Sequence, residues 1–148
     1  MVAGSMCELV SPSTDEEWAS YHRIRRTILF ERRGLFGLYD PNHPDDRKAG
    51  NFAKLLVCHS QHVGVVRIDL AGDVAYLRRV AIDESWQGQG LGRVLLTLSE
   101  SFAIEHGARR MESSVADDAV TFYSKCGYRS RHGGAGNPDT HMIKDLAR

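Results

Sequence analysis

The stretch Gln87-Gly88-Gln89-Gly90-Leu91-Gly92 carries most of what this sequence says about its fold. It follows a strand-like run over residues 75–82 and opens a helix-like run over residues 91–104. The first N–H groups of a helix lack partners within the helix, and the helix dipole adds partial positive charge beside them. Because glycine lets a large anion approach the backbone closely, the stretch predicts a cradle for a phosphate or a pyrophosphate.

Three phosphate-binding motifs could produce such a turn. A P-loop needs Lys and then Ser or Thr after its last glycine, but Arg93 and Val94 follow Gly92. A dinucleotide fingerprint needs glycine or alanine where Arg93 stands. The third pattern, Gln/Arg-x-x-Gly-x-Gly/Ala, matches at Gln87, Gly90 and Gly92. In this pattern the chain resembles the GNAT superfamily of acetyl-CoA-dependent N-acetyltransferases, and a glycine-rich turn without a ligand is the alternative.

Two further segments strengthen the resemblance. Residues 119–128, AVTFYSKCGY, resemble the family's A-x-x-F-Y-x-K-x-G-F/Y segment, and residues 141–146 look like its closing strand. The resemblance covers nearly the whole chain and is strongest from about Val63 onward. It implies a mixed α/β (α+β) fold, with a mostly antiparallel central sheet of about six to seven strands, about four flanking helices, and a splayed parallel strand pair that forms the cofactor slot.

Length and composition limit the possible function classes. A chain of 148 residues predicts one domain with a sizeable core. Its 19 basic and 19 acidic residues give no overall attraction to nucleic acid or to an anionic membrane. No apolar run in the sequence is long enough to span a bilayer. Residues 1–5 look like a remnant of expression cloning, so the expected domain is 6–148.

The three cysteines, Cys7, Cys58 and Cys126, are odd in number and widely spaced, which does not indicate a disulfide framework. A reducing cytoplasm is therefore the expected setting. Cys58, His59 and His62 are close in sequence, but no second ligand pair with zinc-like spacing accompanies them. We therefore expect no metal site.

The remaining chain alternates between helical and strand patterns. Thr14 and Glu17 form a capping box before an amphipathic helix. The basic residues of this helix are expected on a solvated face, and they are Arg23, Arg25, Arg26, Arg32 and Arg33. Residues 34–51 are expected to form a functional loop with a short helical turn. Strands are expected over residues 7–10, 55–59, 63–70, 74–83, 110–115, 128–132 and 141–146, and a mobile turn over 133–138.

Acyl transfer from a thioester to an amine requires a held cofactor, a polarised carbonyl, a deprotonated amine and a protonated thiolate. The resemblance implies that the backbone of residues 87–92 holds the pyrophosphate of coenzyme A, while the strand backbone at Val80 and Ile82 pairs with the pantetheine arm. The amide of Val80 is then expected to polarise the carbonyl. The predicted cofactor-binding residues are Val80, Ile82, Gln87, Gly88, Gln89, Gly90, Leu91, Gly92, Arg93, Phe122 and Tyr123. For Arg93, an exposed first-turn residue is the alternative to a phosphate partner.

Tyr123 is the predicted general acid, because it occupies the position of the family's usual proton donor. A phenol titrates near 10, which is close enough to a thiol for efficient proton transfer to the departing thiolate. The alternative is that Tyr123 only packs in the core beside Phe122.

The sequence does not single out a general base. Some members of the family carry Glu on the strand before the pyrophosphate turn, where this chain has Tyr76. Asp69 is our tentative base, while Glu31 or a relay through water are alternatives, and Asp69 could instead only form a turn at the strand end. Ala116 replaces an Asn that often helps to place the cofactor, which puts that contact in doubt.

Charged residues near the expected acceptor site allow two interpretations each. Strand alternation predicts opposite faces for Arg78 and Arg79, so one of them could pair with a substrate carboxylate, or they could form internal ion pairs. The acidic loop residues Asp40, Asp45 and Asp46 could attract a cationic amine, although a solvated turn is the more common explanation.

The sequence thus predicts an N-acetyltransferase that moves an acetyl group from acetyl-CoA directly to a primary amine of a small molecule or a peptide. A non-catalytic acyl-CoA sensor or interaction module is the alternative, because no base is obvious. A further alternative is a structural subunit of a dimer, in which the pocket is vestigial and binds no cofactor. No nucleic-acid or membrane partner is expected, and the resemblance allows a homodimer. The variable loops at residues 34–51 and 133–138 are expected to select the acceptor.

Overall fold

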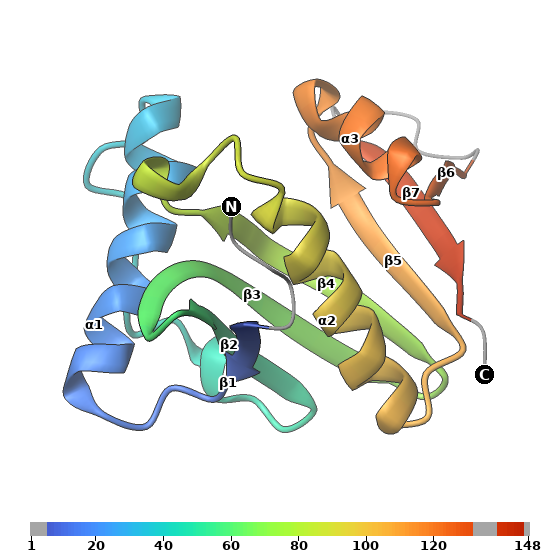
Figure 1. Cartoon of the computed structure of the whole chain (residues 1–148), viewed down its shortest axis with the longest axis horizontal. Coiled ribbons are helices and arrows are strands. Elements are labelled where there is room, and N and C mark those ends of the chain that lie inside the picture. The colour runs from blue at the N-terminus through green and yellow to red at the C-terminus, as the bar shows by residue number, and fades with distance from the viewer. Residues whose placement is uncertain (1–5, 132–138, 147–148) are drawn as a thin grey trace.

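The computed structural model describes residues 6–131 and 139–146, which contain one seven-stranded sheet (Figure 1). The strands follow the order β1-β2-β3-β4-β5-β7-β6, and only the β4–β5 pair is parallel among these described strands. Their bounds are β1 Cys7–Val10, β2 Asn51–Cys58, β3 Gln61–Ala71, β4 Val74–Ile82, β5 Arg110–Val115, β6 Arg129–Ser130 and β7 Thr140–Asp145. The predicted mixed, mostly antiparallel sheet is confirmed. The expectations for residues 1–5 and 133–138 lie outside the described residues.

The first helix changes its winding twice along its length. The predicted capping box is present: Glu17 N–H donates to the Thr14 hydroxyl, and α1 (Asp15–Ile24) begins there. It continues as a π-helix, η2 (Arg25–Phe30), and then as a 3₁₀ turn, η3 (Glu31–Arg33). The other helical segments are η4 Pro44–Arg47, η5 Glu84–Trp86, α2 Leu91–Glu105, η6 Asp117–Ala119 and α3 Val120–Lys125. Among the described residues, no helix is long and apolar enough to cross a membrane.

Helices cover both faces of the sheet because each central strand is apolar on both sides. Leu55 and Leu56 are adjacent on β2 and fully buried, so their side chains point to opposite faces. Leu56 packs in the cluster that contains Leu95 of α2, and Leu55 packs in the cluster that contains Ile24 of α1. The helices α1 and α2 therefore lie on opposite faces of the sheet.

The parallel pair separates along its length, as the resemblance implied. Pairing between β4 and β5 covers only Val74 to Leu77 and Arg110 to Ser113. Figure 1 shows the two strands together where they start and apart where they end, with only the end of β5 beside α3. The β3–β4 register also shifts in this region, and Arg79 has a φ of 56°, so β4 bulges as it leaves β5. The bulge and the separation together open a slot between the strands.

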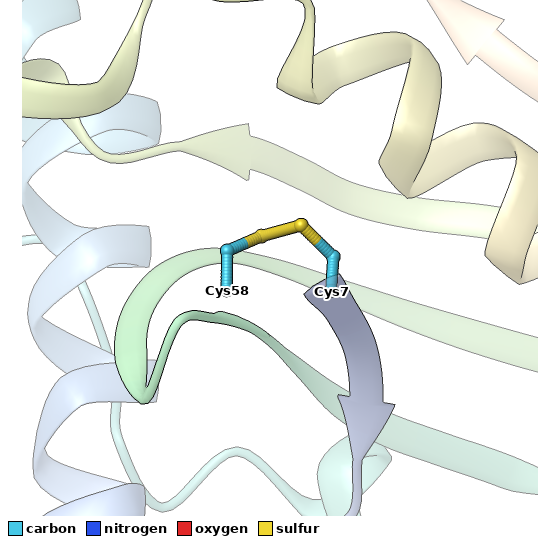
Figure 2. Close-up of a disulfide and its surroundings, with 2 residues drawn as sticks. All are labelled: Cys7 and Cys58. Atoms are coloured by element: carbon cyan, nitrogen blue, oxygen red, sulfur yellow. A yellow bond between two sulfur atoms is a disulfide. The ribbon is translucent and has the colours of Figure 1, made fainter. Parts of the chain in front are cut away.

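A disulfide joins Cys7 to Cys58, which corrects the sequence-based expectation for these two cysteines (Figure 2). The two residues are 51 positions apart, but the antiparallel pairing of β1 with β2 places them directly opposite each other. Spacing in the sequence carries no information about such a long-range pairing. Cys126 is a free, buried thiol.

Arg25 and Asp46 are buried, which corrects the expectation of a solvated helix face and a solvated loop turn at these positions. Their exposed fractions are 3% and 7%, and a nitrogen of Arg25 lies 2.7 Å from a carboxylate oxygen of Asp46. Arg25 follows Tyr21 by one helical turn and donates a hydrogen bond to its hydroxyl. The ion pair ties the loop carrying Asp46 to the first helix, and Arg67 of β3 lies 3.9 Å from the same carboxylate oxygen.

Candidate active site

A cleft of about 320 Å³ lies where β4 and β5 separate. Its walls come from the end of the first helix, from both strands, from α3 and from the segment before β7. The lining residues are Leu29, Arg33, Leu35, Leu77, Arg79, Val80, Ser113, Ser114, Ala116, Tyr123 and Asp139. The cleft brings together Val80 and Tyr123, two residues that the sequence predicts for the site. Beyond Leu77, the described residues provide β4 with no strand partner on its β5 side, so an extended ligand could pair there.

The glycine turn enters α2 without a side-chain cap. Gly88 and Gly90 both have a φ of 80°, a left-handed conformation that glycine adopts without strain. Gly90 is the N-cap residue of α2 and has no side chain to satisfy the first amides of the helix. The first turn thus has the uncapped amides that an anion would bind. Gly88, Gln89, Gly90, Leu91 and Gly92 remain predicted cofactor contacts, supported by this geometry.

Gln87 fixes the start of the turn through its side chain. Its Nε2 donates to the Ile82 carbonyl at 2.9 Å, and its Oε1 accepts from Arg32 at 3.2 Å. Arg32 also pairs with Glu84 of η5. The end of the first helix is therefore tied to the segment that leads into the glycine turn, and this connection positions the cleft beside the predicted pyrophosphate site.

Gly92 and Arg93 connect α2 to α3. A Cβ added at Gly92 would lie 3.0 Å from Cζ of Phe122, so the phenyl ring occupies the space that a side chain would need. Arg93 donates to the Lys125 carbonyl at 3.2 Å, near the C-terminal end of α3. The helix that carries Tyr123 is thus held against the first turn of α2. A phosphate contact for Arg93 and a cofactor contact for Phe122 remain predictions.

Tyr123 packs in the core and also forms part of the wall of the cleft. Only 6% of the residue is exposed, and its ring meets those of Phe122 and Tyr128 edge-on, with centroids 5.6 and 5.3 Å away. Burial raises the pKa of Tyr123 above the ordinary value of 10.0, while its hydrogen bond with Ser113 acts in the opposite direction. The phenol therefore keeps its proton at neutral pH and is able to donate it.

The two neighbouring arginines of β4 have different surroundings. Arg78 lies outside the cleft, with its Nε 3.6 Å from Asp69 and its guanidinium 5.2 Å from the Tyr76 ring centre. Arg79 lines the cleft, and its guanidinium lies 5.4 Å from the Phe30 ring centre. Because the bulge falls between them, simple strand alternation does not describe their directions.

Asp69 does not line the cleft. Both of its carboxylate oxygens accept hydrogen bonds from Arg67, each at 2.8 Å, and Arg78 approaches from the other strand. Glu31, the alternative base, is also absent from the cleft lining, whereas Ala116 is part of it. Neither of the two carboxylates predicted as a base, Asp69 or Glu31, therefore lines the cleft.

Sequence reasoning missed several polar residues of this region. Ser113 and Ser114 line the cleft from β5, and no motif marks them. Next to Ser113, Glu112 is only 3% exposed and lies 2.7 Å from Nε2 of His141 on β7. A glutamate inside an otherwise strand-like run could have indicated a buried carboxylate that needs a partner. The sequence does not identify that partner, because His141 lies on β7, far from Glu112 in the chain. Across residues 6–131 and 139–146, no group of three or more His, Cys, Asp or Glu side chains could hold a metal ion.

Comparison with protein families gives one match, to the acetyltransferase (GNAT) domain, over residues 51–130. A Bacillus subtilis (strain 168) protein described as a candidate acetyltransferase is 26% identical over 119 residues, covering 80% of each chain. The family match includes the glycine turn and Tyr123, and it spans β4 and β5, the strands that form the cleft.

Solved structures have the same architecture. A candidate N-acetyltransferase from Lactobacillus plantarum superposes with a TM-score of 0.78 at 25% identity, over 95% of this chain and 99% of that one. The PaiA N-acetyltransferase from Thermoplasma acidophilum, solved in complex with coenzyme A, superposes with a TM-score of 0.73 at 15% identity, over 95% and 99% of the two chains. At 15% identity, the similarity to the Thermoplasma acidophilum protein shows a shared fold and nothing more.

Proposed function

Because this chain belongs to the GNAT acetyltransferase family and is an acyltransferase, we propose that it transfers an acetyl group from acetyl-CoA directly to a primary amine of a small molecule or peptide. The observation that carries this proposal is the position of Tyr123, whose phenol borders the slot between β4 and β5 while its helix rests on the glycine turn. A thioester placed in that slot would have a proton donor beside its sulfur.

Binding of acetyl-CoA is proposed to use backbone groups more than side chains. The uncapped amides of α2 would hold the pyrophosphate, and the edge of β4 at Val80 and Ile82, beyond its pairing with β5, would hold the pantetheine arm. The Val80 amide would then polarise the thioester carbonyl, since that amide belongs to the strand wall of the cleft. The uncapped helix start and the strand separation support these roles.

In the proposed reaction the amine attacks the thioester carbonyl, the carbon–sulfur bond breaks, and Tyr123 gives its proton to the departing thiolate. Tyr123 is protonated at neutral pH, as this role requires, although burial raises its pKa and so makes the phenol a weaker proton donor. Asp69 is kept as the tentative base. Since its oxygens are bound by Arg67 and it lies outside the cleft, it would have to act through water.

Replacing Tyr123 with Phe tests the proposal most directly, because it removes one hydroxyl and keeps the ring contacts. We expect kcat to fall by about 10² to 10⁴, the usual contribution of a positioned proton donor, with little change in the KM for acetyl-CoA. Thiol release with a panel of amines measures both constants. The matched control is Tyr128→Phe, which loses a buried hydroxyl that donates to Glu100 and does not line the cleft.

The same panel separates an enzyme from a non-catalytic acyl-CoA sensor. A sensor would show an increase in melting temperature with acetyl-CoA, about 2.7 kcal/mol of stabilisation at a hundredfold excess over Kd, but no thiol release with any amine. Unchanged turnover in Tyr123→Phe would remove this residue from the mechanism. An equal loss in Tyr128→Phe would show that the effect is structural.

A further inference from the structure

We propose that the acceptor is a small amine that also carries a carboxylate, and that Arg79 binds this carboxylate at the wall of the cleft. The inference deepens the proposed function and rests on it. It excludes the amino terminus of an extended peptide as the preferred acceptor, because that amine has no free carboxylate nearby.

The position of Arg79 depends on backbone strain. Its φ of 56° lies in the left-handed region, which strains a residue that has a side chain. Such a conformation persists only where the surrounding structure imposes it, and strained residues concentrate at functional sites. Here the bulge in β4 directs Arg79 to the cleft, while the preceding Arg78 lies outside it.

The charges around Arg79 favour an incoming anion. Arg78 has Asp69 as a partner, but among the described residues no carboxylate forms an ion pair with Arg79. Partial burial lowers the pKa of Arg79, and the positive charges of Arg25 and Arg67 lower it further. The charge of Asp46 acts on the pKa of Arg79 in the opposite direction, but Asp46 is already bound by Arg25. A carboxylate would pair with the Arg79 guanidinium, which can bind it through two hydrogen bonds.

The Phe30 ring keeps the Arg79 guanidinium in place. The 5.4 Å separation between the guanidinium carbon and the ring centre is within the range of a cation–π contact. A guanidinium that is already oriented loses less freedom when it binds a carboxylate. Arg79 is thus organised for binding before any ligand arrives.

The size and composition of the cleft favour a small acceptor. A volume of about 320 Å³ is near the lower end for small-molecule sites, and the thioester must share it. Leu29 and Leu35 give the helix-side wall an apolar surface that suits a short hydrocarbon segment between the amine and the carboxylate. An amino acid has this combination of groups.

The experiment compares each of the twenty standard amino acids with its own carboxamide as acceptor, using thiol release from acetyl-CoA. For the preferred acceptor we expect kcat/KM for the acid to exceed that for the amide by about 10- to 100-fold, the value of a charge-assisted hydrogen bond. In Arg79→Met, which keeps an unbranched side chain beside Phe30, this ratio should fall to about one. Arg78→Met, which removes a guanidinium outside the cleft, should retain the ratio.

The outcomes distinguish this inference from the function on which it rests. Turnover that is equal for acids and amides in the unchanged protein would overturn the carboxylate proposal alone. No turnover with any amino acid or carboxamide, while other amines release thiol, would overturn the inference alone, and no turnover with any amine would overturn the proposed function with it. A raised KM for acetyl-CoA in Arg79→Met, with the acid-to-amide ratio retained, would assign Arg79 to the cofactor instead and also overturn the inference.

Discussion

Replacing Cys7 with Ala should destabilise this protein strongly, because it opens a loop that the disulfide closes. The bond to Cys58 spans 51 positions of the chain. In the chain-entropy description, closing a loop of this length removes roughly 14 cal/mol/K from the unfolded ensemble, or about 4 kcal/mol at 25 °C. For 148 residues the unfolding entropy is about 310 cal/mol/K, so the melting temperature should fall by about 13 °C.

The assay is urea and thermal unfolding without reductant, followed by the fluorescence of Trp18 and Trp86. Cys126→Ala is the matched control, since Cys126 is a buried thiol that forms no disulfide. This substitution removes only the packing of one sulfur and should lower the free energy of unfolding by about 1 kcal/mol. Thiol alkylation of the denatured, unreduced protein should label one cysteine.

Two results would refute the reasoning. A Cys7→Ala variant no less stable than Cys126→Ala would show that the bond does not constrain the chain. Three labelled thiols in the unreduced protein would show that Cys7 and Cys58 are reduced, as the predicted cytoplasmic setting requires. The thiol count therefore also tests the prediction about the compartment.

Three further perturbations have expected outcomes. Gly90→Ala must adopt a φ of 80°, so it should lose about 1 to 2 kcal/mol of unfolding free energy in urea and show a smaller melting-temperature increase with acetyl-CoA. Asp46→Ala leaves Arg25 buried without its partner, so it should lose about 3 to 5 kcal/mol in the same assay, and a loss below 1 kcal/mol would contradict a buried ion pair. Burial of Glu112 opposes its ionisation, but hydrogen bonds from His141 and an arginine outweigh this and hold its pKa below 4.5. The stability that this ionisation contributes is present above pH 4.5 and lost as pH falls below it, so Glu112→Gln should lose less stability than the unchanged protein as the pH is lowered through this range.

The fold and part of the site could be predicted because their signals are local. The glycine turn is a run of six residues in which left-handed backbone is needed at Gly88 and Gly90, and the structure has that backbone. The capping box at Thr14 is similarly contained within four residues. Tyr123 was identified from a short motif, and the structure places it at the cleft, although its catalytic role is still a prediction.

The remaining features depend on contacts between distant segments. The disulfide requires the β1–β2 register, and the burial of Arg25 requires Asp46 from a loop 21 residues away. The difference between Arg78 and Arg79 requires a bulge, which strand alternation does not predict. The position of Asp69 near the end of a strand suggests an available base. The sequence does not show that Arg67, two residues earlier, donates hydrogen bonds to both of its carboxylate oxygens.

The π-helical segment η2 has a consequence for how a protein of this kind can change over time. An α-helix rotates by about 100° per residue, so an insertion or deletion normally turns one end of the helix against the other. A π turn already contains an extra residue, and its loss would return the segment to regular α-helix. Deleting one residue within Arg25–Phe30 would therefore be absorbed by this change, and Arg33 at the cleft would keep its orientation relative to the Thr14 cap and the start of α1. The first helix can thus gain or lose one residue between relatives while the cleft-lining residue after the π segment stays in place.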